Sequence, residues 1–177
     1  KYRQQHILNA ILIKSYMKAI DETVTLTSEE ERVLHDYLFS VEIWGHYELL
    51  FFSSCSPLLS VQLFTKYSRE MLRKSDFLQG VGKNRNMMHT LLLNGFMACI
   101  EAGDFTNALY FKKQIEKNFF EENETYFRIV YLWAEGLLDS KQGRVEEGQR
   151  KMEDAIRIFE MIGCSRSADY YRSAMEC

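Results

Sequence analysis

Two stretches of the sequence decide the fold: Gly103-Asp-Phe-Thr-Asn-Ala108 and Gly143-Arg-Val-Glu-Glu-Gly148. In each stretch a glycine is followed by a variable residue, a hydrophobic residue, two polar residues and a small residue. The offset between them, 143 minus 103, is 40 residues, and a fixed period of about 20 to 50 residues is typical of stacked supersecondary units. A glycine permits a sharp turn between two helices, and a small residue lets the helices approach closely. The sequence therefore predicts repeated helix–turn–helix units.

The composition favours long helices over sheets. The chain has 177 residues, of which 46% are hydrophobic, and it contains one proline, Pro57, and 9 glycines. Because proline and glycine interrupt helices, such low numbers leave long uninterrupted helical segments. We expect a single all-α domain over residues 1–177, made of tandem tetratricopeptide-like repeats that form a right-handed superhelical arc. The repeat is degenerate, because its spacing exceeds the usual 34 residues of a tetratricopeptide and Phe96 stands seven residues before Gly103, where that repeat has a small residue.

Hydrophobic residues at spacings of three and four predict a series of helices. Their approximate ranges are 2–20, 28–52, 58–73, 84–102, 104–119, 124–141, 145–162 and 165–175. Thr27 or Ser28 is expected to cap the second helix, because the acids Glu29 to Glu31 that follow suit the positive end of a helix dipole. The serine-rich stretch around Pro57 is expected to end it.

The charge pattern and the cysteines exclude several classes of protein. The formal net charge is −3 without a long run of one sign, so this chain is not expected to bind DNA or RNA directly. The apolar stretch within residues 1–14 is too short to span a bilayer, and no signal-peptide cleavage site follows it. The four cysteines are widely separated and lack a C-x-x-C pairing, so we expect reduced thiols and a cytoplasmic protein.

The sequence contains no motif that is typical of an enzyme. It has no glycine-rich phosphate loop and no H-E-x-x-H or similar ligand spacing, so we expect no catalytic residue, no cofactor and no metal. His6, His35, His46 and His89 are scattered over the predicted helices, where each is either a structural or surface residue, or else a ligand contact or a pH-responsive switch. An enzyme would require a perturbed acid or base in a deep pocket.

Three residues are candidates for ligand recognition. Trp44 and Trp133 lie on the first helix of a predicted pair, which is the helix expected to line the inner face of the array. They either pack between pairs or form apolar pockets of a groove for an extended peptide. Asn94 lies in an apolar run between Leu93 and Phe96, where an unpaired amide would be costly to bury. It is either a groove amide that pairs with a peptide backbone or an ordinary surface residue.

Four further segments carry a resemblance to a known family. They are Tyr37-Leu-Phe-Ser-Val-Glu-Ile-Trp-Gly-His-Tyr-Glu-Leu-Leu50, Tyr67-Ser-Arg-Glu-Met-Leu72, Glu101-Ala-Gly-Asp-Phe105 and Met152-Glu-Asp-Ala-Ile-Arg-Ile-Phe159, the last followed by Ile162-Gly163. Over nearly the whole chain, the sequence resembles the C-terminal domain of the Rgg/GadR/MutR transcriptional regulators of Gram-positive bacteria. The resemblance implies a quorum-sensing homodimer. Its repeat domain would bind a short hydrophobic signalling peptide on a concave face, and an N-terminal helix-turn-helix domain, outside this sequence, would bind promoter DNA.

The repeat geometry selects inner-face positions on the first helix of each pair as the peptide-binding site. They are Glu42, His46, Leu49 and Phe52, then Thr90, Asn94 and Met97, and then Val130, Trp133 and Leu137. The apolar members would form pockets, and Asn94 and Glu42 would donate or accept hydrogen bonds. The C-terminal helix is expected to form the dimer interface through Tyr170, Tyr171 and Met175, because an array must cover its last apolar face.

A second reading is a tetratricopeptide-type scaffold that docks the tail of a partner protein. A clamp of inner-face lysines and arginines would favour that scaffold, whereas the predicted inner face is mainly apolar. We therefore expect a ligand-sensing domain that passes peptide binding on to the DNA-binding domain.

Overall fold

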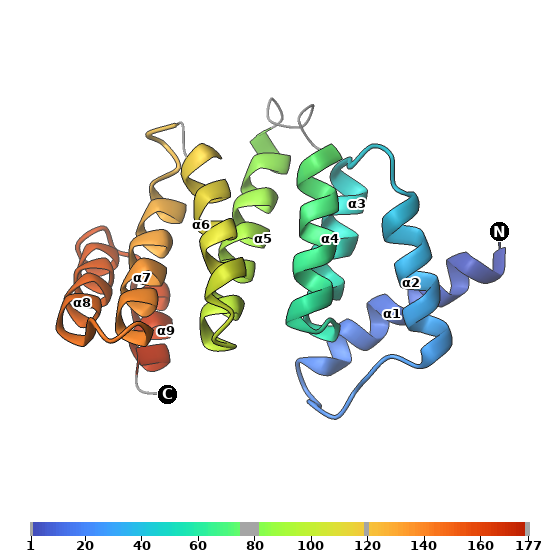
Figure 1. Ribbon diagram of the computed structural model, residues 1–177, viewed down its shortest axis with the longest axis horizontal. Helices are drawn as coiled ribbons and strands as arrows, with labels where there is room; N and C mark the ends of the chain where they lie inside the picture. Colours follow the sequence, from blue (N-terminus) through green and yellow to red (C-terminus); the bar gives the residue numbers. More distant parts are fainter. Residues whose placement is uncertain (1, 75–81, 119–120, 176–177) are drawn as a thin grey trace. The chain divides into compact units, whose positions relative to one another are not determined.

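The computed structural model describes residues 2–74, 82–118 and 121–175, and within these ranges the chain forms helices and no strands (Figure 1). This confirms the predicted all-α fold. The helices are α1 (Tyr2–Lys18), α2 (Ser28–Ser40), α3 (His46–Cys55), α4 (Val61–Lys74), α5 (Gly82–Glu101), α6 (Phe105–Asn118), α7 (Thr125–Lys141), α8 (Val145–Met161) and α9 (Ser165–Met175), with the short 3-10 helix η1 (Ser56–Leu58) between α3 and α4. The chain divides into two compact units, residues 1–91 and 92–177.

The core of the first unit is built around Phe52 on α3. The centroid of its ring lies 5.7 Å from that of Trp44, 5.2 Å from that of Phe64 and 6.2 Å from that of Tyr67. All four side chains are buried, and α1 packs beside this cluster against α2, α3 and η1. Trp44 thus takes the core-packing role that the sequence left open.

The first turn of α2 is fixed by Thr27, one of the two predicted caps. Its hydroxyl accepts from the amide of Glu30 at 3.3 Å, and its own amide donates to the Glu30 carboxylate at 2.7 Å. This reciprocal pair satisfies two amides that a helix start would otherwise leave unpaired. The same carboxylate accepts from Lys14 at 2.6 Å, so Glu30 also fastens α1 to α2.

The predicted helix over 28–52 is wrong, because the chain breaks between Ser40 and His46. Val41 is extended, with φ −64° and ψ 114°, and Gly45 starts α3 with its amide donating to the Glu48 carboxylate at 3.0 Å. Lys74 donates to the carbonyls of Phe39 and Val41, at 3.2 and 2.7 Å, and so satisfies acceptors that the end of α2 leaves open. The break went unseen because the buried residues Val41 and Trp44 continue the apolar spacing of α2.

In the second unit, three glycines close the turns between successive helices. Gly103, Gly143 and Gly163 have φ of 71°, 92° and 79°, in the left-handed region that other residues adopt at a cost. After each glycine, the next amide donates back to the residue five positions earlier: Asp104 to Cys99 at 2.9 Å, Arg144 to Asp139 at 2.9 Å and Cys164 to Phe159 at 2.8 Å. These are Schellman caps, and they confirm the helix–turn–helix units that the glycine spacing predicts.

Helices α7 and α8 approach closely at a pair of glycines. A Cβ atom on Gly148 would lie 2.4 Å from the carbonyl oxygen of Gly136 and 2.7 Å from the amide of Ser140. A Cβ atom on Gly136 would lie 2.6 Å from the carbonyl oxygen of Gly148. The small residue of the repeat therefore sets the distance between the two helices, as the sequence predicts.

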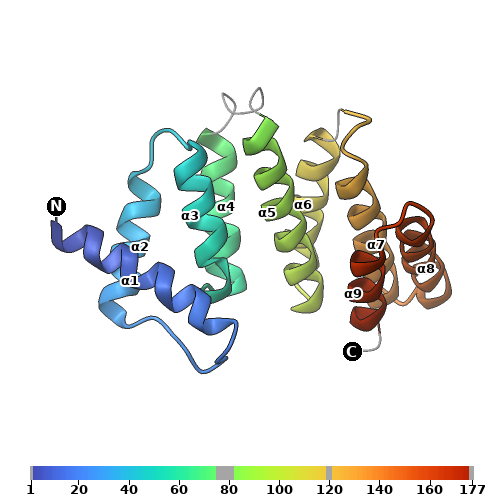
Figure 2. The same cartoon turned by 180° about the vertical axis from the view of Figure 1, so that it is seen from behind.

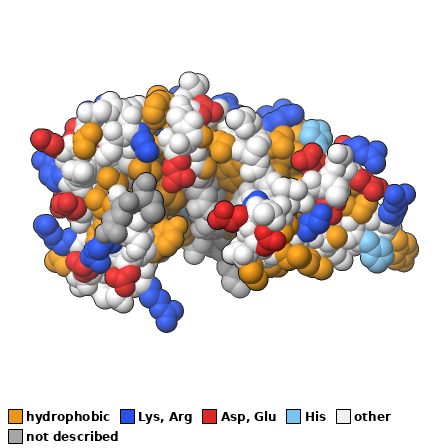
Figure 3. All heavy atoms as spheres, turned by 90° about the horizontal axis from the view of Figure 1, so that it is seen from below, with side chains coloured by type: hydrophobic (Ala, Val, Ile, Leu, Met, Phe, Trp, Pro, Cys, Tyr) orange, Lys and Arg blue, Asp and Glu red, His pale blue; other side chains and the backbone are white. Residues whose placement is uncertain are grey.

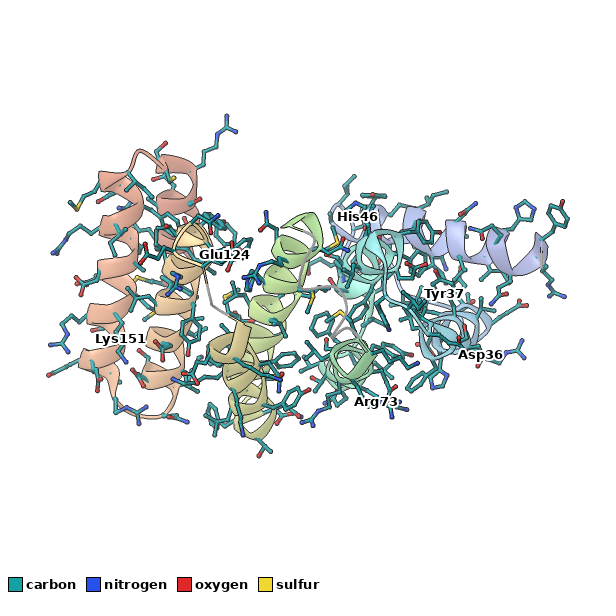
Figure 4. The ribbon with its side chains drawn as sticks, turned by 90° about the horizontal axis from the view of Figure 1, so that it is seen from above. Asp36, Tyr37, His46, Arg73, Glu124 and Lys151 are labelled. Carbon is teal, nitrogen blue, oxygen red and sulfur yellow. The ribbon has the colours of Figure 1, made fainter. Side chains whose placement is uncertain are left out.

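The α7–α8 turn is also held by the buried carboxylate of Asp139. It accepts from Arg144 and from Lys151, the latter at 2.6 Å, and Figure 4 shows Lys151 on α8. Burial opposes ionisation of this carboxyl, but the hydrogen bonds from Lys151 and Arg144 outweigh it and lower the pKa of Asp139. Asp139 thus ties the last turn of α7 to the first turns of α8.

Candidate functional site

The second unit contains a cavity of about 220 Å³ lined by α5, α7 and α9. Figure 2 shows these three helices from the side on which α9 lies in front. The lining residues are Asn94, Met97, Ala98, Glu101, Trp133, Tyr170, Tyr171 and Ala174. Drug-sized ligands occupy pockets of about 300 to 1,000 Å³, so this cavity suits one or two side chains of a larger, extended ligand.

Stacked aromatic rings form one wall of the cavity. The ring centroid of Trp133 lies 5.2 Å from that of Tyr171, which in turn stacks on Phe159 at 5.7 Å with an interplanar angle of 6°. Trp133 and Tyr171 are 3% and 6% exposed, and burial raises the pKa of Tyr171. Tyr170 packs edge-on against Tyr171 at 5.0 Å and is itself 68% exposed. The wall is therefore aromatic and mostly buried, with one phenol ring left in solvent.

The indole nitrogen of Trp133 is a buried donor that lacks an acceptor. Its Nε1 atom has no hydrogen-bond partner among the described residues. A buried polar group without a partner costs about 1 to 3 kcal/mol, so an acceptor that reached this nitrogen would recover part of that cost. The amide of Asn94 and the carboxylate of Glu101 add two exposed polar groups to the lining.

Three of the predicted peptide-binding residues meet in this cavity: Asn94, Met97 and Trp133. Val130 and Leu137 lie one turn before and one turn after Trp133 on α7, where Val130 is buried and Leu137 is half-buried, and neither lines the cavity. Trp133 combines the two roles that the sequence left open, because it packs against Tyr171 and also faces the cavity.

The other five predicted residues lie in the first unit. Glu42, His46 and Thr90 are exposed, and the hydroxyl of Thr90 donates to the carbonyl of Asn86 at 3.0 Å. Leu49 and Phe52 have 0% exposure, so neither offers surface to a ligand in this conformation. Their predicted place on the inner face assumed an unbroken helix from residue 28.

The break before α3 changes which side chains of this helix face solvent. Tyr47 and Leu50 are the exposed apolar residues of α3, a stripe that the sequence did not single out. His46, labelled in Figure 4, lies at the first residue of α3, and its Nδ1 is 3.2 Å from Oδ1 of the buried Asn84. This contact holds His46 against α5.

The residues predicted for the dimer interface lie on α9, but they do not share one surface. Tyr170 and Tyr171 line the cavity beside Trp133. Met175 is half-buried and lines a second cavity of about 460 Å³ between α8 and α9, together with Arg157, Glu160 and Arg172. The dimer interface predicted at these residues stays a prediction, and in the structure Tyr170 and Tyr171 line the same cavity as three of the predicted peptide-binding residues.

The sequence did not select Ala98, Glu101 or Ala174 for the site. Glu101 could have been found, because it stands four residues after Met97 and seven after Asn94, on the same stripe of α5. The contribution of α9 could not have been found from the sequence, because it depends on how α9 packs against α7 and α8.

The described residues contain neither a metal-binding cluster nor a membrane-spanning helix. Among the described residues, there is no group of three or more histidine, cysteine, aspartate or glutamate side chains that could hold a metal ion. No described helix is long and apolar enough to cross a membrane. Figure 3 shows basic and acidic side chains interspersed over one face of the molecule.

Comparison with known proteins assigns the chain to a family. Residues 1–173 match the family described as HTH-type transcriptional regulator Rgg, C-terminal domain. The SHP pheromone receptor Rgg2 of Streptococcus dysgalactiae is 28% identical, with a TM-score of 0.85 over 96% of this chain and 65% of the receptor. A cysteine-to-serine variant of that receptor gives 28% identity and a TM-score of 0.87, with 96% of this chain and 62% of the receptor covered.

A third structure shares the fold at lower identity. It is a putative transcriptional regulator from Listeria monocytogenes EGD-e, 19% identical, with a TM-score of 0.83 over 97% of this chain and 61% of that chain. The chain thus spans less than two thirds of the length of the regulators that it matches. Because the family match extends over nearly all of its residues, the chain belongs to the Rgg family of HTH-type transcriptional regulators and corresponds to the C-terminal domain of that family.

Proposed function

We propose that this chain is the ligand-sensing domain of a quorum-sensing transcriptional regulator, and that the cavity between α5, α7 and α9 binds part of a short hydrophobic signalling peptide. The observation that carries this proposal is the meeting of Asn94, Met97 and Trp133 with Tyr170 and Tyr171 in one cavity that has both apolar and polar lining. Binding sites typically combine such apolar walls with a few polar groups that fix orientation. The 28% identical Rgg2 is an SHP pheromone receptor, which supports the same ligand class here.

In this proposal, each group has a defined role. An apolar side chain of the peptide fills the cavity against Met97 and the Trp133 ring. The Asn94 amide pairs with a peptide backbone group, and the Trp133 indole N–H donates to a peptide carbonyl. These hydrogen bonds fix the direction of an extended chain while apolar contact supplies affinity.

Helix α9 is the element that would pass on the binding event. Tyr170 and Tyr171 face the cavity, while Arg172 on the same helix pairs with Glu160 of α8. A peptide that binds better to one position of α9 shifts the domain toward that position. In a cytoplasmic, homodimeric full-length protein, this shift would change how an N-terminal helix-turn-helix domain acts on promoter DNA.

The lining of the cavity does not favour the scaffold reading, and the family does not favour an enzyme. None of the described residues that line it is lysine or arginine, so it lacks the cationic clamp that a scaffold for acidic tails would need. We propose a non-catalytic role, because the family consists of transcriptional regulators.

Isothermal titration calorimetry tests the proposal. We expect saturable binding of hydrophobic peptides encoded beside the gene, and about tenfold weaker binding by Asn94→Ala and by Trp133→Phe, each of which removes a hydrogen bond to the ligand. Asn9→Ala removes a similar exposed amide far from the cavity in sequence and should bind like the unmodified chain. Equal affinity in all four proteins would place the peptide elsewhere, and heat from none of them would reject the peptide-sensing function.

A further inference from the structure

The electrostatics of the cavity indicate which part of a peptide it would accept. Glu101 is the one charged residue among the described residues that line the cavity. Its side chain is exposed, and within the described ranges it makes no ion pair. The carboxylate is therefore free to attract a cation at the rim.

The position of Glu101 strengthens this attraction. It is the last residue of α5, and the last turn of α5 contains no basic side chain. The carbonyl groups at a helix C-terminus carry partial negative charge, so an acid there is in an unfavourable place and a cation is favoured. The exposed ring of Tyr170 lines the same cavity, and an aromatic face also attracts cations.

The remaining lining fits an apolar group that carries a hydrogen-bond acceptor. Met97, Ala98 and Ala174 supply apolar surface, and Trp133, which also lines the cavity, has a buried indole N–H without an acceptor among the described residues. The first residue of a peptide combines these features within a few ångströms, because its ammonium, its side chain and its carbonyl share one Cα. A lysine side chain supplies an ammonium and an apolar stem, but not the nearby carbonyl.

From this arrangement we propose that the cavity binds an ammonium group joined to an apolar residue, with Glu101 as its charge partner and the free amino terminus of the peptide as the favoured source. This inference rests on the proposed peptide-sensing function and adds to it the direction in which the peptide chain lies in the cavity. The amino-terminal end lies beside Glu101, and the rest of the peptide extends past Asn94.

Three amidated probes separate the sources of the cation. They are the tripeptide Leu-Ile-Leu with a free amine, the same tripeptide acetylated at its amine, and an acetylated tripeptide in which lysine replaces the first leucine. Binding is followed by NMR titration of the Trp133 indole N–H signal, which is identified by its loss in Trp133→Phe. Trp44 supplies an internal reference signal, because it is buried in the first unit.

We expect acetylation to weaken binding about two- to fivefold, the range typical of an exposed ion pair. Glu101→Gln should weaken binding of the free-amine probe by the same factor and leave the acetylated probe unaffected, so that the two changes are not additive. Added salt should reduce the difference between the probes. Glu146→Gln removes an exposed acid in the first turn of α8 and should preserve the full difference.

The outcomes separate this inference from the function on which it rests. Equal binding of all three probes, or an acetylation effect that persists in Glu101→Gln, would overturn the charge pairing while leaving peptide binding intact. Stronger binding of the lysine probe than of the free amine would reject the amino terminus as the favoured source. No change in the Trp133 signal with any probe would reject both the inference and the cavity as a peptide site.

Discussion

At the scale of single residues, burial decides which of the predicted side chains can act. The sequence singles out Asn94 because an unpaired amide in an apolar run is costly to bury, and Trp133 because it lies on the first helix of a predicted pair. The structure places both in one cavity. Leu49 and Phe52 had the correct spacing but are fully enclosed. Spacing predicts that residues share a face of a helix, and tertiary packing decides whether that face is open.

Asp139 is expected to make the stability of the domain depend on pH. Its pKa is lowered in the fold, so its ionised form stabilises the folded state at neutral pH, and this contribution is lost as the pH falls below about 4. Asp139→Asn should lower the free energy of unfolding by about 1 to 3 kcal/mol at pH 7, measured by urea denaturation. The difference between variant and parent should shrink at pH 3, and an equal difference at both pH values would contradict this role.

The cysteines should differ strongly in reactivity. Burial raises the pKa of Cys55 to about 12, and Cys99 is also buried, whereas Cys164 is half-exposed. Because the thiolate is the reactive form, iodoacetamide at pH 8 should alkylate Cys55 more than about tenfold slower than Cys164. Mass spectrometry of the native protein over time measures this ratio, and denaturation should abolish it. Cys177 lies outside the described residues.

At the scale of elements, turn glycines made the helical hairpins predictable. Gly103 and Gly143 revealed the repeat, and the structure adds Gly163, which closes the next turn with the same cap. The break between α2 and α3 was not predictable from periodicity, because Val41 and Trp44 keep the helical spacing although the backbone at Val41 is extended. Gly45, which caps α3, was the available signal.

The turn at Gly143 should tolerate asparagine better than alanine. A Cβ atom there meets nothing within 4 Å, but the residue has a φ of 92°. Gly143→Ala should therefore cost about 1 to 2 kcal/mol through backbone strain alone, and Gly143→Asn less, because asparagine adopts left-handed conformations more readily. Thermal unfolding of the two variants measures the difference, and equal losses would show that strain is not the cause.

Gly148→Ala should destabilise the domain more than Gly143→Ala, and through steric overlap instead of backbone strain. A Cβ atom there would overlap the Gly136 carbonyl and the Ser140 amide, so the backbones of α7 and α8 would have to separate. Overpacking of this kind typically costs about 1 to 3 kcal/mol. An unchanged melting temperature of Gly148→Ala would contradict the close approach of the two helices.

At the scale of the whole molecule, the cavity is assembled from residues 94 to 174, and three separate helices contribute to it. The sequence predicted the contributions of α5 and α7, because each follows the repeat pattern. It did not predict the contribution of α9, because the pattern does not determine which neighbours a terminal helix covers, and the dimer interface predicted at Tyr170 and Tyr171 is not tested by their place in the cavity. The predicted superhelical arc and the homodimer stay predictions.

Hydrogen–deuterium exchange of the chain with and without a bound hydrophobic peptide tests the central claim most directly. Bound ligand slows exchange in the segments that it orders. We predict protection in the second half of α5, in α7 around Trp133 and in α9 around Tyr170 and Tyr171, with smaller effects in α8. Protection confined to residues 2–74, with no change in α7 or α9, would contradict the account.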